Sequence, residues 1–237
     1  MRILGIETSG DTSSVALLED NEVASEEIFA SRRTICQVLV GHILSVVGTE
    51  TIVAARLDGI AVSSGPASFT GLRVGVTTAK ALAYSCQIPV VGVSTPLAWS
   101  VEVRAEPGTM IVVLQPARRH RLYLTAFLQG EEALPEQQGD ARVVDIGGAV
   151  AACSDLATDH TIVVTGDALL TEAGLVEALA TRSRVTDLEV DSPRASTIAR
   201  LGAVLIKDAP SDSYFSLRPN YLMVSQAERG LGVNLGL

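Results

Sequence analysis

A short polar turn near the start of the chain holds residues that could bind a phosphate group. It reads Thr-Ser-Gly-Asp and follows the apolar run at residues 2–7. Backbone N–H groups and hydroxyls in such a turn can surround a phosphate, although a polar hairpin loop has the same composition. The candidates for phosphate binding are Thr8, Ser9, Gly10 and Asp11.

A second turn, residues 63–75, reads SSGPASFTGLRVG and leads from an expected strand into an expected helix. Ligands of open α/β sheets gather at the carboxyl ends of strands, where a helix N-terminus presents free N–H groups to an anion. The alternative is that the glycines form the turn and that Ser68 or Thr70 caps the helix.

Motifs for metal binding and for several kinds of catalysis are absent from the sequence. His42, His120 and His160 form no HxxxH, HExxH or HxH pair, and the three cysteines form no CxxC pair, so no metal site is expected. No GxSxG or P-loop motif occurs, and no GxGxxG stands in a suitable context. Serine hydrolase, P-loop NTPase and dinucleotide-dependent enzyme are therefore unsupported.

The charge and the aromatic content bear on nucleic-acid binding. The 237 residues include 18 Lys and Arg against 27 Asp and Glu, for a net charge of −9, and 4% are aromatic. Cations provide non-specific grip on phosphates, and aromatic rings stack on bases, so we expect nucleic acid to be reached only through a partner. No signal peptide or run of 18 apolar residues occurs, which predicts no membrane span and a cytoplasmic protein.

The hydrophobic pattern predicts the elements that position the two turns. Their order is βββαβαβα up to residue 105, and after the linker Glu106-Pro107-Gly108 the same order returns, which indicates an architectural duplication. We expect strands at 2–7, 14–18, 23–29, 57–62, 90–94, 110–114, 121–128, 142–144, 161–165 and 185–190. We expect helices at 34–47, 70–86, 95–103, 149–157, 171–181 and 196–206.

A duplicated pattern with a polar first turn suggests the actin-like, RNase H-like (ASKHA) fold of actin, Hsp70 chaperones and sugar kinases. This is an α/β fold of two lobes, each a mixed sheet flanked by helices. We expect a first lobe at 1–105, a second at 106–210, and a tail at 211–237 that packs back on the first.

Enzymes of that fold hold phosphate and metal with an acid on the first strand and with turns in both halves. Glu7 could serve in the first half. The corresponding run of the second half, residues 113–117, has no carboxylate, and its Pro116 lacks a backbone donor. Asp167 is the only later acid in a comparable place. An autonomous ATP-dependent phosphotransferase is therefore disfavoured and stays the alternative function.

Two helices carry more apolar surface than one core contact requires. In the helix at 70–86, very small residues recur at every fourth position, which lets another helix approach closely. In the helix at 34–47, Cys36, Val40, Leu44 and Val47 widen the apolar face. Such a surface marks an interface or, as the alternative, a helix buried within a larger monomer.

Four segments, in order from residue 1 to about residue 228, resemble the TsaB (YeaZ) family. They read ILGIETSGDTSSVALLED, SSGPASFTGLRVGVTTAKALAY, ARRHRLY and RPNYLMVSQAE. Members are non-catalytic subunits of the bacterial machinery that makes threonylcarbamoyladenosine at position 37 of tRNAs reading codons that begin with A. The resemblance implies a catalytically inactive scaffold or activator that binds a TsaD-like catalytic subunit.

The resemblance also implies the other partners. These are a TsaE-like ATPase, tRNA only indirectly, and a second copy of the chain when it is alone. No cofactor is expected, with ATP or ADP bound only within the assembled complex. By position, the implied partner interface consists of Ile35, Leu39, His42, Gly71, Leu72, Gly75, Val76, Ala79 and Ala83.

Two departures from the family pattern bear on these expectations. Ile35-Cys36-Gln37 replaces a polar His-Ser-Glu stretch, which alters the expected partner contact, and Gln115-Pro116 stands where members often have Asp, which weakens nucleotide or metal binding. The cluster Arg118, Arg119 and Arg121 is either a tRNA contact or a solvated face. A metallopeptidase, suggested by an older glycoprotease label for this superfamily, lacks the paired histidines that it would need.

Overall fold

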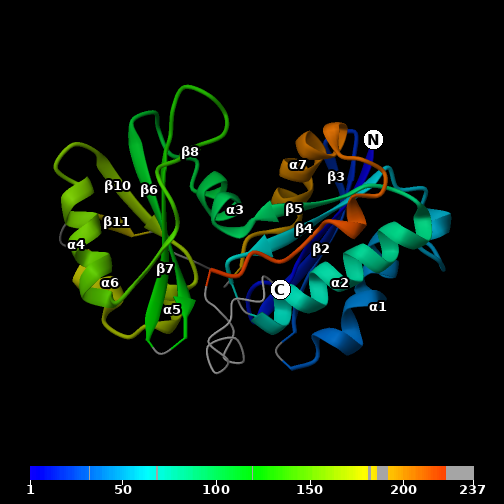
Figure 1. The fold of residues 1–237 in the computed structure, drawn as a ribbon, viewed down its shortest axis with the longest axis horizontal. Coiled ribbons are helices and arrows are strands. Elements are labelled where there is room, and N and C mark those ends of the chain that lie inside the picture. The colour runs from blue at the N-terminus through cyan, green and yellow to red at the C-terminus, as the bar shows by residue number, and fades with distance from the viewer. Residues whose placement is uncertain (32, 68, 119, 181–182, 186–191, 223–237) are drawn as a thin grey trace.

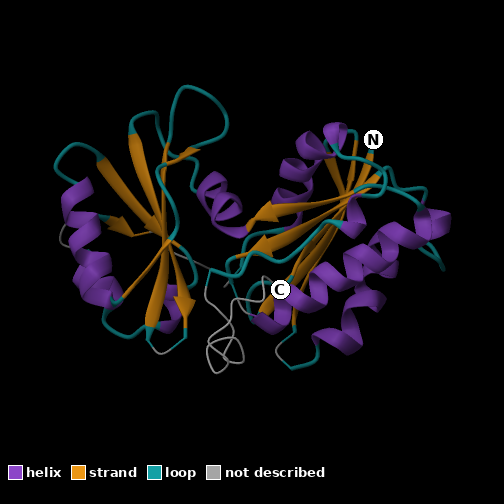
Figure 2. Cartoon of the chain, in the orientation of Figure 1, coloured by secondary structure: helices purple, strands orange, loops and turns teal. Residues whose placement is uncertain are grey.

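Two mixed β-sheets divide the chain into two lobes, with helices on the faces of each sheet (Figures 1 and 2). The structure is a computed structural model, and it describes residues 1–222 except 32, 68, 119, 181–182 and 186–191.

The first sheet has the strand order β3-β2-β1-β4-β5. β1 runs antiparallel to β2 and parallel to β4. It is buried on both faces, which explains its almost unbroken apolar sequence. The strands are β1 (Arg2–Glu7), β2 (Thr12–Glu19), β3 (Glu22–Ala30), β4 (Gly59–Gly65) and β5 (Val90–Ser94).

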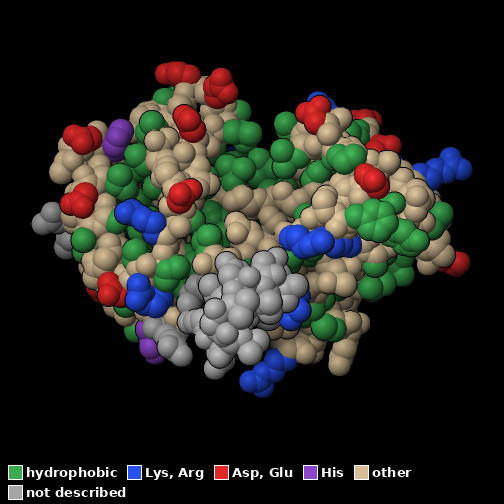
Figure 3. All heavy atoms as spheres, in the orientation of Figure 1, with side chains coloured by type: hydrophobic (Ala, Val, Ile, Leu, Met, Phe, Trp, Pro, Cys, Tyr) green, Lys and Arg blue, Asp and Glu red, His purple; other side chains and the backbone are tan. Residues whose placement is uncertain are grey.

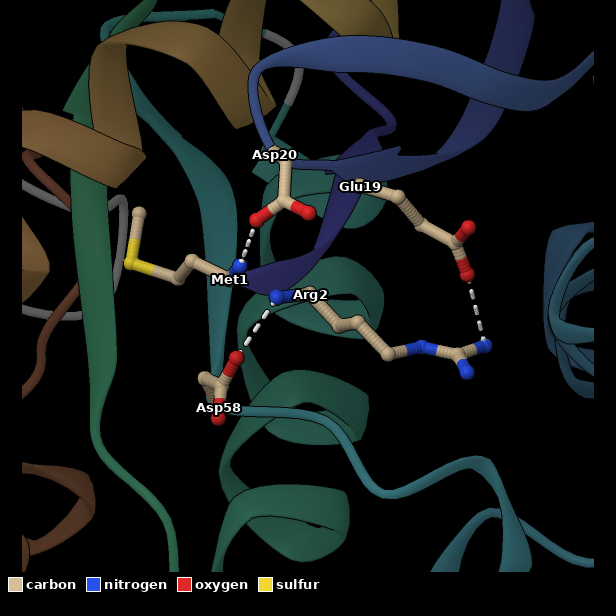
Figure 4. Close-up of polar contacts among 5 residues, drawn as sticks. All are labelled: Met1, Arg2, Glu19, Asp20 and Asp58. Atoms are coloured by element: carbon tan, nitrogen blue, oxygen red, sulfur yellow. Dashed lines mark hydrogen bonds and ion pairs between the residues drawn. The ribbon is translucent and has the colours of Figure 1, made fainter.

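The start of β1 is tied to its neighbours by polar contacts (Figure 4). The Arg2 guanidinium lies 3.2 Å from Glu19, and the Arg2 backbone N–H donates to Asp58 at 2.6 Å. The N-terminal ammonium pairs with Asp20. These groups are mostly exposed, so they contribute little to stability and chiefly hold the chain end against the sheet.

The second sheet repeats the first strand by strand. Its order is β11-β10-β6-β7-β8, with β9 also paired to β7. Taken as first to fifth strands, β6, β7, β9, β10 and β11 have the same neighbours and the same parallel or antiparallel relations as β1 to β5. The duplicated actin-like fold is thereby confirmed. The strands are β6 (Thr109–Ala117), β7 (Arg121–Leu128), β8 (Glu136–Gln137), β9 (Arg142–Val144), β10 (Thr161–Thr165) and β11 (Arg184–Val185).

Helices cover both faces of each sheet with separate hydrophobic clusters. On the first sheet, α1 and α2 cover one face and α7 covers the other. On the second sheet, α4, α5 and α6 cover one face, and α3 covers the other through Trp99. The helices are α1 (Ile35–Val47), α2 (Phe69–Cys86), α3 (Thr95–Glu102), α4 (Ile146–Leu156), α5 (Ala168–Thr171), α6 (Leu175–Leu179) and α7 (Ala195–Leu205).

The last helix of each half contacts the sheet of the other half. α3 follows β5 and packs on β6 and β7 as well as on β4 and β5, whereas α7 follows the second-lobe strands but packs on β1, β2 and β4. The sequence placed α7 in the second lobe, at 106–210, whereas its apolar side belongs to the first-lobe core. The boundaries of the three predicted regions themselves stay a prediction.

Glycines let α7 approach the first sheet closely. A Cβ atom on Gly202 would lie 2.1 Å from the Cβ of Ala61, and one on Gly5 would lie 2.2 Å from the Ala195 carbonyl oxygen. A larger residue at either position would therefore require the helix or the sheet to move.

The segment after α7 runs along the first lobe. It contains two 3₁₀ turns, η2 (Ile206–Asp208) and η3 (Ser213–Phe215). The Val90 N–H donates to the Ser213 hydroxyl at 2.9 Å, and the Asn220 N–H donates to the Ser64 carbonyl at 2.7 Å. These bonds join the chain after α7 to β5 and to the carboxyl end of β4.

The structure differs from the predicted elements in a few places. Within the helix expected at 171–181, the structure has only the short α6, which follows Gly174 with a φ of 78°; α5 ends at Thr171, and residue 181 lies outside the described residues. Of the strand expected at 185–190, the described part is β11, and residues 186–191 lie outside the described residues. β8 and the turn η1 (Val53–Ala55) are too short to show a period in the sequence.

Candidate functional site

The predicted phosphate turn lies at the carboxyl end of β1 and is largely filled by its own side chains. The Thr8 hydroxyl donates to the Gly71 carbonyl at 2.9 Å, and Thr8 and Ser9 are 1% and 3% exposed. Gly10 is half-buried and Asp11 is exposed, and the Asp11 carbonyl accepts from the backbone N–H of Ser31 at 3.0 Å. Phosphate binding by these four residues stays a prediction, and the Thr8 hydroxyl is already committed to α2.

Glu7 is the buried carboxyl group of this turn. It is fully shielded from solvent, one oxygen accepts the Ser9 N–H, and Oε2 has no hydrogen-bond partner among the described residues. Burial raises the pKa of Glu7 from 4.5 to about 7, and hydrogen bonds from Ser9 and Ser63 offset this only in part. Near neutral pH the group is therefore poised between a neutral acid and a carboxylate.

The second lobe places no carboxylate opposite Glu7 on its first strand. β6 carries Gln115, which is 2% exposed, and Pro116, which pairs in register with Leu122 of β7. Asp167, the later acid named from the sequence, directly precedes α5, and Gly166 before it has a φ of 108°. The acidic residues thus do not form a pair across equivalent strands.

The second polar turn joins β4 to α2 and is covered by the chain after α7. The peptide bond between Gly65 and Pro66 is cis, and the Gly65 N–H donates to the Thr95 hydroxyl at 3.2 Å. The Ser64 carbonyl is taken by Asn220. α2 begins at Phe69; of the two predicted caps, Ser68 lies outside the described residues and Thr70 lies inside the helix.

The small-residue stripe of α2 faces the interior of the lobe. A Cβ atom on Gly75 would lie 2.2 Å from the Thr8 hydroxyl oxygen. Ala79 and Ala83 are fully buried in the cluster beneath α2. The stripe therefore lets α2 approach β1 and its turn, which is a contact within this chain.

The other residues of the predicted partner interface are also buried or half-buried within the first lobe. Those with buried side chains are Ile35, Leu39, Leu72 and Val76. Gly71 and His42 are half-buried, and the His42 ring stacks on Phe29 with centroids 3.7 Å apart while its Nδ1 lies 2.6 Å from Glu27. The nine predicted interface residues thus pack within the first lobe. A partner contact at α1 and α2 stays a prediction, and it would use the exposed sides of these helices.

The exposed sides of α1 and α2 lie next to each other on the first lobe (Figure 1). Val40 is 47% exposed, which agrees with the excess apolar surface read from the sequence, whereas Val47 is buried. Ala81 and Thr77 were not singled out in the sequence, because a small exposed residue has no distinct pattern. We name this surface the α1–α2 face: Cys36, Gln37, Val40, Gly41, Thr70, Thr77 and Ala81.

The predicted arginine cluster and the metal-binding residue types give no further site. Arg118 and Arg121 are exposed at the β6–β7 turn, and Arg121 donates to the Val143 carbonyl at 3.1 Å. Arg119 lies outside the described residues. Within the described part of the chain, no three His, Cys, Asp or Glu side chains are grouped so as to hold a metal, and no helix is long and apolar enough to cross a membrane.

Comparisons with known proteins agree with the resemblance read from the sequence. The family described as "TsaD: tRNA N6-adenosine threonylcarbamoyltransferase" matches residues 33–165. A Bacillus subtilis protein named tRNA threonylcarbamoyladenosine biosynthesis protein TsaB is 29% identical, over 96% of both chains. The Escherichia coli protein of the same name is 31% identical, over 56% of this chain and 58% of its own.

The fold also matches a solved structure. A structure described as YeaZ from Pseudomonas aeruginosa has a TM-score of 0.72 at 20% identity and covers 93% of this chain and 99% of its own. The match with the family over more than half of the chain and the full-length similarity to TsaB lead to one conclusion. The chain belongs to the family described as TsaD, and within it to the TsaB (YeaZ) proteins.

Proposed function

We propose that this chain is a non-catalytic scaffold or activator in the biosynthesis of threonylcarbamoyladenosine at position 37 of tRNAs that read codons beginning with A. It acts by binding a TsaD-like catalytic subunit and assembles with a TsaE-like ATPase. The observation that carries the proposal is the similarity to TsaB over 96% of the chain. The exposed helix pair of the first lobe supports it by supplying a surface for a protein partner.

The interior of the first turn supports a role without chemistry of its own. The Thr8 hydroxyl donates to Gly71 instead of facing a ligand, and Gln115 and Pro116 occupy the equivalent strand of the second lobe. A phosphotransferase of this fold would need donors and acids at these places. We propose that the chain carries no resident nucleotide or metal, and that ATP or ADP binds only in the assembled complex.

The α1–α2 face is the proposed contact with the TsaD-like subunit, and with a second copy when the chain is alone. Val40 supplies an exposed apolar side chain, and Gly41, Thr77 and Ala81 are small enough to let a partner helix approach. Close packing of small and apolar residues between helices is the usual geometry of helical interfaces. The buried residues Gly75, Ala79 and Ala83 take no part in the contact, because they already touch their own lobe.

Depletion of the protein followed by mass spectrometry of tRNA nucleosides tests the function. We expect loss of threonylcarbamoyladenosine and its return on re-expression. An undiminished level in cells without a second copy of the gene would contradict the proposal. Calorimetry of the isolated chain with ATP and Mg²⁺ tests the alternative, since tight binding with turnover would favour a phosphotransferase.

An arginine substitution on the exposed side of α2 tests the interface. Ala81→Arg places a long charged side chain on the α1–α2 face, so co-purification with the TsaD-like subunit should fall at least tenfold, as for loss of a hot spot. Ala151→Arg, at an exposed alanine of α4 in the second lobe, is the matched control and should have no effect. Equal co-purification of both variants and the unmodified chain would exclude this face. Gly75→Leu is unsuitable because it would clash with Thr8 inside the lobe.

A further inference from the structure

Three of the nine aromatic residues gather where the end of α2 meets η3. Tyr84 and Phe215 are 57% and 66% exposed, whereas Tyr214 is only 7% exposed. The Tyr214 ring lies 4.8 Å from the Phe215 ring and 5.4 Å from the Tyr84 ring, between centroids. One buried ring thus holds two exposed rings in fixed positions on the surface of an otherwise aromatic-poor protein.

Two cations lie beside these rings and converge on one carbonyl oxygen. The Lys80 ammonium donates to the Leu217 carbonyl at 3.0 Å, and Nη1 of Arg218 donates to the same carbonyl at 3.0 Å. Nη1 of Arg218 also donates to the Phe215 carbonyl at 2.6 Å. Within the described residues neither cation forms an ion pair with a carboxylate. In the space-filling view, Lys and Arg side chains lie over α2 on the right-hand lobe, close to apolar side chains (Figure 3).

Two like charges that share one carbonyl repel each other, and an anion placed between them would remove that repulsion. Burial and the nearby Arg218 both lower the pKa of Lys80. The geometry therefore favours a negatively charged ligand at this place.

The exposed rings indicate which class of negatively charged ligand would bind beside the two cations. Exposed aromatic rings beside Lys and Arg are the combination that binds unpaired nucleotides, in which the bases stack on the rings and the phosphates meet the cations. A duplex hides the faces of its bases, so it offers nothing for the rings. Tyr, Phe and Arg are also common in protein interfaces, so a protein partner is the alternative occupant that the experiment below distinguishes.

We propose that Tyr84, Phe215, Lys80 and Arg218, named here the aromatic–cation surface, bind unpaired nucleotides of an RNA. The proposal rests on the proposed function, in which the RNA is a tRNA held by the assembled complex. It departs from the expectation that nucleic acid is reached only through a partner, because two cations and two rings give a local and weak contact that needs no broad electrostatic grip. The surface adjoins the α1–α2 face at the end of α2, so RNA bound there can be presented to a partner.

Fluorescence anisotropy with a labelled 12-nucleotide oligouridylate tests the proposal on the full chain across a range of salt concentrations. Phe215→Ala and Tyr84→Ala should each weaken binding about tenfold, as for loss of one stacked base, whereas Tyr84→Phe should bind as the unmodified chain does. The double variant Lys80→Gln with Arg218→Gln should lower the log–log salt slope by about 1.4, at about 0.7 per phosphate contact of a single strand. Arg142→Gln, at an exposed arginine of β9, is the control and should change neither quantity.

Several results would overturn the proposal. They are no salt-dependent binding by the unmodified chain, unchanged affinity and slope in the ring and cation variants, or equal losses in Arg142→Gln. If free UMP or ATP displaces the oligonucleotide, and if the same variants weaken binding of the free nucleotide, the surface is assigned to free nucleotides instead. If the ring and cation variants lose co-purification with the TsaD-like subunit but bind RNA as the unmodified chain does, the aromatic–cation surface is assigned to a protein partner instead.

The proposed function is tested separately by tRNA nucleoside analysis. A chain required for threonylcarbamoyladenosine whose surface variants bind RNA normally would refute the surface alone. A chain that binds RNA through this surface but is dispensable for the modification would refute the function alone.

Discussion

The Glu7→Gln substitution isolates the contribution of the buried carboxyl group at the end of β1. Glutamine has nearly the same shape, and its side-chain oxygen can accept the Ser9 N–H as Glu7 does. It cannot ionise. Any difference in the pH dependence of stability between the two proteins therefore reports the proton of Glu7.

The sign follows from the raised pKa. Below pH 4.5 the folded and unfolded chains both hold the proton, so this part of the stability is complete. Between pH 4.5 and about 7 the unfolded chain releases the proton while the folded chain retains it, so the free energy of unfolding falls as the pH rises. The pKa difference of about 2.5 corresponds to a loss of about 3 kcal/mol, at 1.36 kcal/mol per pKa unit.

Urea unfolding of both proteins at a series of pH values measures this loss. The stability of Glu7→Gln relative to the unmodified chain should rise by about 3 kcal/mol across the window and stay constant above it. If the difference in unfolding free energy between the two proteins changes by less than about 0.5 kcal/mol across the pH window, the reasoning is refuted, because the pKa of Glu7 in the folded chain would then be ordinary. The carbon-13 chemical shift of the Glu7 carboxyl gives the same pKa directly, without unfolding the protein.

Substitutions at Gly202, Gly41 and Ser213 test the packing of the first lobe. Gly202→Ala places a methyl group against Ala61, so urea unfolding should show a loss of about 1–3 kcal/mol, whereas Gly41→Ala, with nothing within 4 Å, should gain about 0.5–1 kcal/mol. Equal effects of the two alanines would mean that α7 does not approach the sheet as described. Ser213→Ala removes the acceptor of the buried Val90 N–H and should cost about 1–3 kcal/mol in the same assay, with Ser213→Thr retaining most of the stability. A loss for Ser213→Ala below about 0.5 kcal/mol would contradict a structural role for the chain after α7.

Local periodicity was sufficient for most elements. The expected strands at 2–7, 90–94, 121–128 and 161–165 have the same bounds in the structure, because a buried or alternating run identifies a strand without knowledge of its neighbours. The helix expected at 171–181 is interrupted at Gly174, whose positive φ depends on how the chain must turn between α5 and α6. A spacing of apolar residues does not reveal that turn.

The candidate site was harder to predict from the sequence than the secondary structure was. A stripe such as Gly75 and Ala79 allows close approach, but the sequence does not say whether the approaching group belongs to a partner or to the same chain. In the structure the group at Gly75 is the Thr8 side chain. The aromatic–cation surface had no sequence signal either, since Tyr84 and Phe215 are 131 positions apart and meet only because the chain after α7 returns to the first lobe.

The sequence by itself determined the duplicated order of elements, the acidic charge and the family, because these depend on composition, period and short motifs. Tertiary structure alone decided which side of each helix is covered. α7 crosses to the first sheet and α3 packs on both sheets, since each sheet has a second apolar face that its other helices leave open. That arrangement joins the lobes, and the segment after α7 then contacts β4 and α2, where it decides which groups of the first lobe are exposed.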